Sequence, residues 1–199
     1  MDHKSVNNAI PTEEEQKKSV LAYFRDVVFL VTAVVLIFSF CFRVVVVSGP
    51  SMKNTLIDGD WLLLLGSTLY TQPEKGDIIV VSKDSYDDGT PIIKRVIALE
   101  GQRVDIDFEN GIVYVDDVAL DEPYTRTLTT TPEGVVFPVT VPEGCVFVLG
   151  DNRDNSRDSR YPAIGMIDKR EILGKALFLF VPGNEKGAVT RDFSRIGGV

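Results

Sequence analysis

VVVVSGPSM, residues 44–52, marks the point where the chain changes from an apolar, helix-like segment to a strand-forming one. Four consecutive valines favour a strand, because β-branched side chains pack well on a pleated surface. The Gly49-Pro50 pair then predicts a sharp turn. Ser51 follows this turn, which suits a nucleophile, because the strand behind it can hold the hydroxyl still. An ordinary surface turn has the same pattern.

An uncharged run of sixteen residues, Val27–Phe42, precedes this stretch. At about 1.5 Å per residue the run spans roughly 24 Å as a helix, and Leu21–Phe24 can extend it if Arg25 snorkels. The run is apolar on all faces, which disfavours the alternative of a buried helix in a soluble domain. We therefore expect one transmembrane helix, at residues 20–43.

The apolar run does not end in a clear small-x-small site, which favours an uncleaved signal anchor over a cleaved signal peptide. Three basic residues lie shortly before the run (Lys17, Lys18 and Arg25), against two soon after it. This bias favours a cytoplasmic N-terminus. The expected organisation is a cytoplasmic tail at 1–19, a membrane anchor at 20–43 and an extracytoplasmic β-rich domain at 44–199.

The chain beyond the apolar run contains short segments rich in Val, Ile and Leu that are separated by Gly, Pro, Asp and Asn. This pattern is typical of a mostly β domain with a closed or folded sheet. A polar, Thr-rich stretch at 116–134 predicts an excursion from that sheet. The predicted strands are Val44–Val47, Trp61–Leu65, Asp77–Val81, Ile92–Leu99, Arg103–Asp107, Ile112–Val115, Val135–Val141, Cys145–Leu149 and Ile172–Val181.

The composition excludes several classes of protein. The net charge is −8 and no basic patch exists at domain scale, so we expect no nucleic-acid partner. Cys41 lies in the apolar run and Cys145 in the later domain, which disfavours a disulfide, and zinc-ligand spacing is absent. His3 is the only histidine of the chain. A Ser-His-Asp triad is therefore impossible in the main domain, and another group must accept the proton of Ser51.

Lys94 lies within an apolar run, PIIKRVIAL at residues 91–99. Burial disfavours the ammonium form, and the pKa of a lysine must fall about three units from about 10.4 for it to act as a base near neutral pH. Such a shift corresponds to roughly 4 kcal/mol, which is within the range known for buried lysines. An outward-facing lysine on an edge strand fits the strand pattern equally well.

GDNRDNSRDSR, residues 150–160, is the densest polar stretch and follows the apolar run Cys145–Leu149. Three interpretations are open: a solvated loop, a calcium loop, or a network of Asp–Arg pairs and Asx turns that positions a site. Three interleaved arginines, and the lack of the expected Gly and distal Glu, argue against calcium.

Taken together, these stretches resemble the type I signal peptidases, membrane-bound Ser-Lys endopeptidases that remove signal peptides from exported proteins. The nucleophile motif of that family, Ser-Met-x-Pro-Thr-Leu, reads SMKNTL at residues 51–56. The lysine block resembles Lys94-Arg95-Val96 followed by Gly101. The late block, Gly-Asp-Asn-Arg-x-x-Ser-x-Asp-Ser-Arg, matches residues 150–160 without a break.

The resemblance implies a signal-peptidase-like folded β-sheet catalytic domain with a smaller insertion around residues 105–140, and no cofactor or metal. It implies that Ser51 is the nucleophile and that uncharged Lys94 is the general base. By the same resemblance, Ser156 orients the lysine, and Asp158 supports the late block together with Arg160.

Two positions depart from the family pattern. Asn54 stands where proline is usual. Gly49 stands where some members carry a serine whose hydroxyl completes the oxyanion hole, and others carry glycine. The oxyanion donors expected here are the N–H group of Ser51 and a backbone group at or near Gly49; loss of one donor typically costs about 100- to 1000-fold in rate.

The resemblance also implies two partners, the signal peptides of exported preproteins and the lipid bilayer of the cell membrane. An extended substrate with small residues before the cut could pair with residues 44–47 by strand addition. Trp61 and Leu62–Leu65 could form a surface on the lipid, although a buried strand fits them better. Five apolar residues are candidates for shallow substrate pockets, and ordinary core packing fits each of them as well: Val45, Val47, Met52, Leu56 and Ile93.

Two other functions are compatible with some of the same residues. A self-cleaving Ser-Lys repressor-type protease is disfavoured by the apolar helix and the lack of a DNA-binding domain. A non-enzymatic, membrane-anchored β interaction module is disfavoured because all the expected catalytic residues are present.

Overall fold

The computed structural model describes residues 13–184 and 190–199 and divides the chain into two compact units, with the boundary after Ser39. Helix α1 (Glu13–Cys41) makes up the described part of the first unit and continues into the second. Its segment Ser19–Cys41, with a mean hydropathy of 2.2, is long and apolar enough to cross a membrane.

Helix α1 differs from the predicted anchor at both ends. It begins at Glu13, inside the expected tail, whose residues 1–12 lie outside the described part of the chain. It ends at Cys41, and Phe42 and Arg43 already belong to strand β1 (Phe42–Val46). Strand β1 starts this early because Phe42 and Arg43 pair in register with the strand that follows, as the valines after them do.

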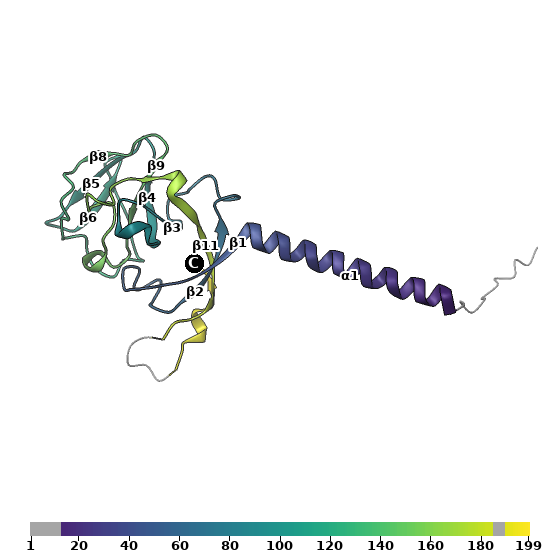
Figure 1. Ribbon diagram of the computed structural model, residues 1–199. Coiled ribbons are helices and arrows are strands. Elements are labelled where there is room, and N and C mark those ends of the chain that lie inside the picture. The colour runs from purple at the N-terminus through teal and green to yellow at the C-terminus, as the bar shows by residue number, and fades with distance from the viewer. Residues whose placement is uncertain (1–12, 185–189) are drawn as a thin grey trace, which may run out of the picture. The chain divides into compact units, whose positions relative to one another are not determined.

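The second unit is built from two antiparallel sheets (Figure 1). The larger sheet has eight strands. Seven of them lie in the order β1, β2 (Trp61–Gly66), β11 (Ile172–Val181), β3 (Ile78–Val81), β4 (Ile92–Leu99), β9 (Cys145–Leu149) and β10 (Ile167–Asp168), and β12 (Gly197–Gly198) pairs with β11. The smaller sheet has the order β7 (Val118–Ala119), β6 (Ile112–Val115), β5 (Arg103–Asp107) and β8 (Val139–Thr140).

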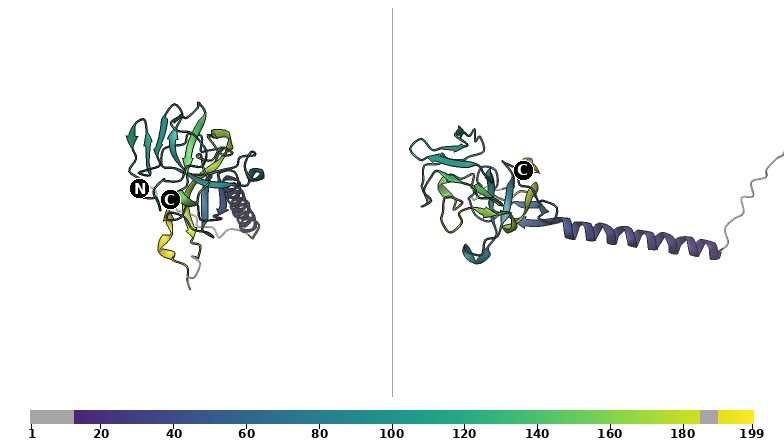
Figure 2. Two further views of the ribbon diagram at one scale, coloured as in Figure 1. Left: turned by 90° about the vertical axis from the view of Figure 1, so that its left-hand side faces the viewer. Right: turned by 90° about the horizontal axis from the view of Figure 1, so that it is seen from above.

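Strands far apart in sequence meet in the larger sheet. Blue β2 and yellow-green β11 lie side by side in both Figure 1 and Figure 2, and they pair in antiparallel register. Four short 3-10 turns connect the strands of the domain: η1 (Asp87–Gly89), η2 (Arg153–Asn155), η3 (Lys169–Glu171) and η4 (Phe193–Arg195).

The prediction of a mostly β domain after one N-terminal apolar helix is confirmed, and β4, β5, β6, β9 and β11 have the predicted bounds. The predicted strand Val135–Val141 is wrong, because only Val139–Thr140 forms a strand. The N–H group of Val135 donates to the carbonyl oxygen of Arg160 instead of to a neighbouring strand, and Pro138 has no N–H group to donate.

Strand β2 follows the alternation of a half-buried strand. Leu62 and Leu64 are fully buried in a core cluster with Leu56 and Met52, so they cannot rest on lipid. Trp61 is 42% exposed and packs edge-on against Phe180 with the ring centroids 6.2 Å apart. The interpretation of this segment as a buried strand is therefore correct for Leu62 and Leu64.

A second core cluster joins the two sheets. Phe147 and Leu149 of β9 pack with Val104 of β5 and Val113 of β6. This cluster holds the smaller sheet against β4, which carries Lys94, and against β9, which precedes the late block.

The C-terminal segment is tied to the turn that follows Ser51. Arg195 Nη1 and Nη2 lie 2.8 Å and 2.7 Å from the two carboxylate oxygens of Asp60, which is 0% exposed. The backbone N–H groups of Ile57 and Gly183 donate to the same carboxylate. Asp60 therefore depends on Arg195 for the neutralisation of a buried charge.

Replacing Arg195 with alanine should lower the free energy of unfolding by about 3 kcal/mol, because a buried carboxylate is left without its cation. Urea denaturation of the full chain in detergent measures the change. Arg170→Ala is the matched control, since Arg170 and its partner Asp168 form an exposed ion pair on the same domain and should matter little. Equal stability of the two variants would show that Asp60 does not depend on Arg195.

Candidate active site

Lys94 lies in the middle of the larger sheet, on β4, which is paired with β3 on one side and β9 on the other. The residue is 3% exposed, and its Nζ lies 2.9 Å from Ser51 Oγ and 2.9 Å from the carbonyl oxygen of Ile93. The alternative of an outward-facing lysine on an edge strand is wrong. The fold therefore brings a buried amine and a serine hydroxyl into hydrogen-bond distance.

Burial lowers the pKa of Lys94 to about 8, because the ammonium form loses its hydration. The carboxylates of Asp158, Asp151 and Glu133 oppose this shift, and the guanidinium of Arg160 adds to it. Near pH 8 a substantial fraction of Lys94 is the uncharged amine, which is the form that can accept a proton.

The turn that carries Ser51 is held by the late block. The N–H group of Asn152 donates to the carbonyl oxygen of Ser51 at 2.9 Å, and the side-chain amide donates to that of Pro50 at 3.0 Å. Asn152 was not singled out in the sequence, although it belongs to the late block. Asn152 therefore holds the two peptide groups on either side of the nucleophile, Pro50–Ser51 and Ser51–Met52.

The backbone near Gly49 is already engaged. The N–H group of Gly49 donates to Asp58 Oδ1 at 2.8 Å, so this group is not available as an oxyanion donor. The predicted oxyanion role of Gly49 is therefore not supported. The N–H group of Ser51 donates to no acceptor within residues 13–184 and 190–199.

Asn54, which replaces the proline of the family pattern, has a backbone φ of 121°. Proline cannot adopt this conformation, because its ring fixes φ near about −65°. The side-chain amide of Asn54 also donates to the carbonyl oxygen of Thr125, at 3.3 Å. The turn after Ser51 thus follows a path in which asparagine is suitable and proline is not.

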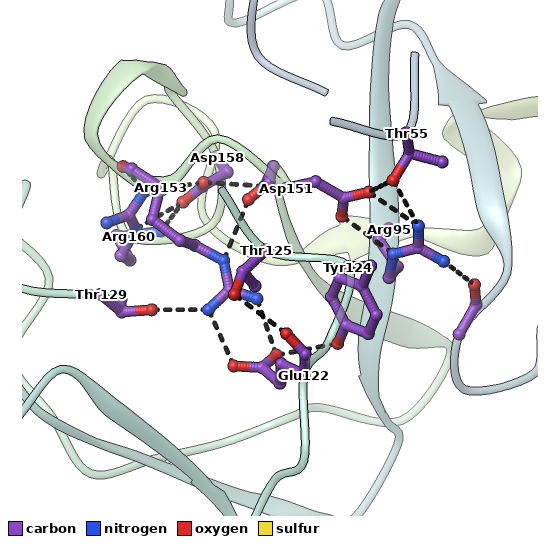
Figure 3. A network of polar contacts seen from close by, with 12 residues as sticks. Thr55, Arg95, Glu122, Tyr124, Thr125, Thr129, Asp151, Arg153, Asp158 and Arg160 are labelled. Carbon is purple, nitrogen blue, oxygen red and sulfur yellow. Dashed lines mark hydrogen bonds and ion pairs between the residues drawn. The ribbon is translucent and has the colours of Figure 1, made fainter. Parts of the chain in front are cut away.

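The late block is a buried polar network rather than a solvated loop (Figure 3). Arg160 donates from Nε and Nη2 to the two oxygens of Asp158, at 2.9 Å each, and both side chains are fully buried. Asp158 also accepts from the N–H group of Gly150 at 3.0 Å. The pair therefore closes the loop by linking its first residue to its last.

A second pair joins the late block to the lysine block. Arg95, the neighbour of Lys94, donates to both oxygens of Asp151 at 2.9 Å and 2.7 Å and lies over the ring of Tyr124 (Figure 3). Thr55, from the turn after Ser51, donates its hydroxyl to the same carboxylate. Sequence reasoning missed this contact, although both partners lie inside the matched motifs.

Arg153 anchors the late block to the smaller sheet's loops. Its guanidinium donates to both oxygens of Glu122, at 3.0 Å and 2.6 Å, and its Nε donates to the carbonyl oxygen of Gly150 at 3.0 Å (Figure 3). The excursion from the main sheet therefore helps to support the loop beside Lys94.

Ser51 and Lys94 both line one cavity. Ser156 lines it too and is 4% exposed, and its Oγ has no hydrogen-bond partner within the described residues. Glu133, which the sequence gave no reason to select, lines the same cavity. Its remaining lining residues are Tyr86, Ile92, Asp154, Asn155 and Arg157.

None of the five predicted substrate-pocket residues lines this cavity. Val47, Met52 and Leu56 are buried in a closed core cluster, and Val45 and Ile93 are partly buried against it. Their role in substrate binding stays a prediction.

A mostly β domain that sets a serine hydroxyl against a buried lysine amine is the arrangement expected of a serine hydrolase whose proton acceptor is lysine instead of histidine. Residues 20–181 match the family described as "Signal peptidase, peptidase S26". The chain belongs to this family.

Relatives from several bacteria match most of the chain. A signal peptidase I of Bacillus licheniformis is 34% identical over 87% of this chain and 97% of its own length. A signal peptidase I S of Bacillus subtilis (strain 168) is 34% identical over 85% and 94% of the two chains. A probable signal peptidase I-1 of Synechocystis sp. is 41% identical over 71% and 72%.

Proposed function

We propose that this serine endopeptidase of the signal peptidase family removes signal peptides by attack of Ser51 on the scissile carbonyl, with Lys94 as the general base. The observation that carries the proposal is the 2.9 Å contact between Ser51 Oγ and the buried Nζ of Lys94. Uncharged Lys94 takes the hydroxyl proton as Ser51 Oγ bonds to the carbonyl carbon.

The tetrahedral intermediate that forms carries a negative oxygen, toward which the N–H group of Ser51 is the available donor. When the intermediate collapses, the C–N bond breaks and the Lys94 ammonium returns its proton to the leaving amine. Water then attacks the acyl-serine ester, with Lys94 again taking a proton, and the signal peptide leaves as a carboxylate. Ser156 Oγ, buried in the same cavity, would accept a hydrogen bond from the ammonium.

The proposed function also includes a membrane anchor and a position for the substrate. Helix α1 anchors the chain through Ser19–Cys41, with the N-terminus in the cytoplasm and the β domain, including its insertion at about 105–140, outside. Strand β1 is the first strand in the order of the larger sheet, so an extended signal peptide could pair with its outer edge. This places the substrate beside the segment that leads into Ser51.

The pH dependence of cleavage tests the role of Lys94. With a preprotein that carries an Ala-x-Ala site, kcat/KM should fall on the acidic side with a midpoint at about 8, because the ammonium form of Lys94 cannot accept a proton. Below this midpoint the rate should drop about tenfold for each pH unit. N-terminal sequencing of the product fixes the cleavage point. An acidic limb near pH 4 would instead identify a carboxylate as the base.

A further inference from the structure

Glu133 is an acidic residue of the active-site cavity to which the proposed mechanism gives no role. Its Oε2 is buried and has no hydrogen-bond partner within residues 13–184 and 190–199, as is also true of Ser156 Oγ. Both residues line the cavity that contains Ser51 and Lys94. A buried carboxylate oxygen without a partner is costly, so its presence here points to a partner that forms during the reaction.

The other carboxylates around Lys94 are already neutralised. Asp158 accepts hydrogen bonds from Nε and Nη2 of Arg160, and Asp151 accepts hydrogen bonds from Nε and Nη2 of Arg95. The remaining charged residues that line the cavity, Asp154 and Arg157, are exposed to solvent. Glu133 differs from Asp158 and Asp151. It is partly buried in the cavity, and no guanidinium is bound to it in the described chain.

We propose that Glu133 is a positioning residue for Lys94, and that its carboxylate stabilises the ammonium which Lys94 becomes after it has taken the proton of Ser51. The proposal rests on the Ser51–Lys94 mechanism given above. The uncharged amine of Lys94 already contacts Ser51 Oγ and the carbonyl oxygen of Ile93. The ammonium carries a further N–H group, and Ser156 Oγ and Glu133 Oε2, which have no partner in the described chain, belong to residues that line the same cavity.

The electrostatics agree with this geometry. The carboxylate of Glu133 raises the pKa of Lys94, against the larger effect of burial. Burial, and then Asp158, raise the pKa of Glu133, whereas Arg160, the backbone N–H group of Asp158 and Arg157 oppose that rise and favour the carboxylate form. The carboxylate form of Glu133 therefore favours the ammonium form of Lys94.

The test is the pH profile of preprotein cleavage by Glu133→Gln. Removal of the negative charge should move the acidic midpoint of kcat/KM to lower pH by about one unit, as one unit charge does across a cavity of this kind. The rate on the plateau should fall about threefold to tenfold, because a weaker base transfers the proton less readily. Glu133→Asp, which keeps the charge, should return the midpoint toward that of the wild type.

Glu143→Gln is the matched control, since Glu143 is exposed and lies outside the cavity. It makes the same change in net charge and should leave the midpoint unchanged. A midpoint for Glu133→Gln equal to that of the wild type overturns the proposal, as does an equal shift in Glu143→Gln. Failure of the underlying mechanism looks different, because Lys94→Ala would then still cleave the preprotein.

Discussion

Ser51→Ala and Lys94→Ala should each lower kcat/KM for preprotein cleavage by about 10⁴-fold or more, because nucleophile and base act as one unit. Ser51→Ala removes the atom that forms the acyl-enzyme, and Lys94→Ala removes the amine that lies 2.9 Å from it. The double variant should be no worse than either single variant, since the second change removes nothing that still works. Cleavage of a preprotein in detergent, followed over time by product mass, measures all three.

Lys75→Ala is the control for the lysine variant, since Lys75 is exposed on the same domain. It should retain the activity of the wild type. Substantial cleavage by Ser51→Ala would contradict the proposed nucleophile. A cell whose signal-peptide processing depends on this chain should also lose that processing with either alanine variant, whereas a non-enzymatic interaction module would keep its function.

Gly150→Ala should reduce kcat/KM by about 100-fold or more, since displacement of catalytic groups by about 1 Å has an effect of this size. A Cβ atom at this position would lie 2.1 Å from Ser156 Oγ and 2.6 Å from the carbonyl oxygen of Ser51. Neither approach is tolerable, so Ser156 or the nucleophile turn must move. Steady-state kinetics of the variant, compared with its thermal unfolding midpoint, measure the effect.

Gly197→Ala is the matched control for this substitution. A Cβ atom at Gly197 would have no heavy atom within 4 Å, so the variant should be as active as the wild type. The double variant Gly150→Ala with Ser156→Gly removes one of the two clashes and separates the effect on Ser156 from that on Ser51. Wild-type activity in Gly150→Ala would show that the late block does not pack against the nucleophile turn.

The strands and the candidate dyad could be predicted because their signals are local. Runs such as Ile92–Leu99 and Cys145–Leu149 are bounded by turn residues and have the predicted limits. The position of Lys94 was ambiguous, because a strand pattern does not reveal whether a strand is central or at an edge. Only the pairing of β4 with both β3 and β9 decides that the amine is buried.

Other features depend on contacts between distant segments and left no signal in the sequence. Glu133 lies in a polar, Pro- and Gly-containing stretch and enters the cavity only through the folding of the loop around it. The N–H group of Gly49 is engaged by Asp58, nine residues further on, which no turn pattern predicts. Arg195 lies beyond the segment that matches the family, yet it neutralises the buried Asp60 beside the nucleophile turn.

The ionisation of Lys94 is the most direct test of the Ser51–Lys94 mechanism, because that mechanism needs the uncharged amine. Nuclear magnetic resonance of the full chain in detergent, with ¹³C-labelled lysine, can follow the Lys94 side chain as a function of pH. The signal is assigned by its absence from Lys94→Ala. We expect a titration midpoint at about 8. A midpoint near the ordinary lysine value of about 10.4 would contradict this mechanism, because Lys94 would then be almost entirely an ammonium near pH 8.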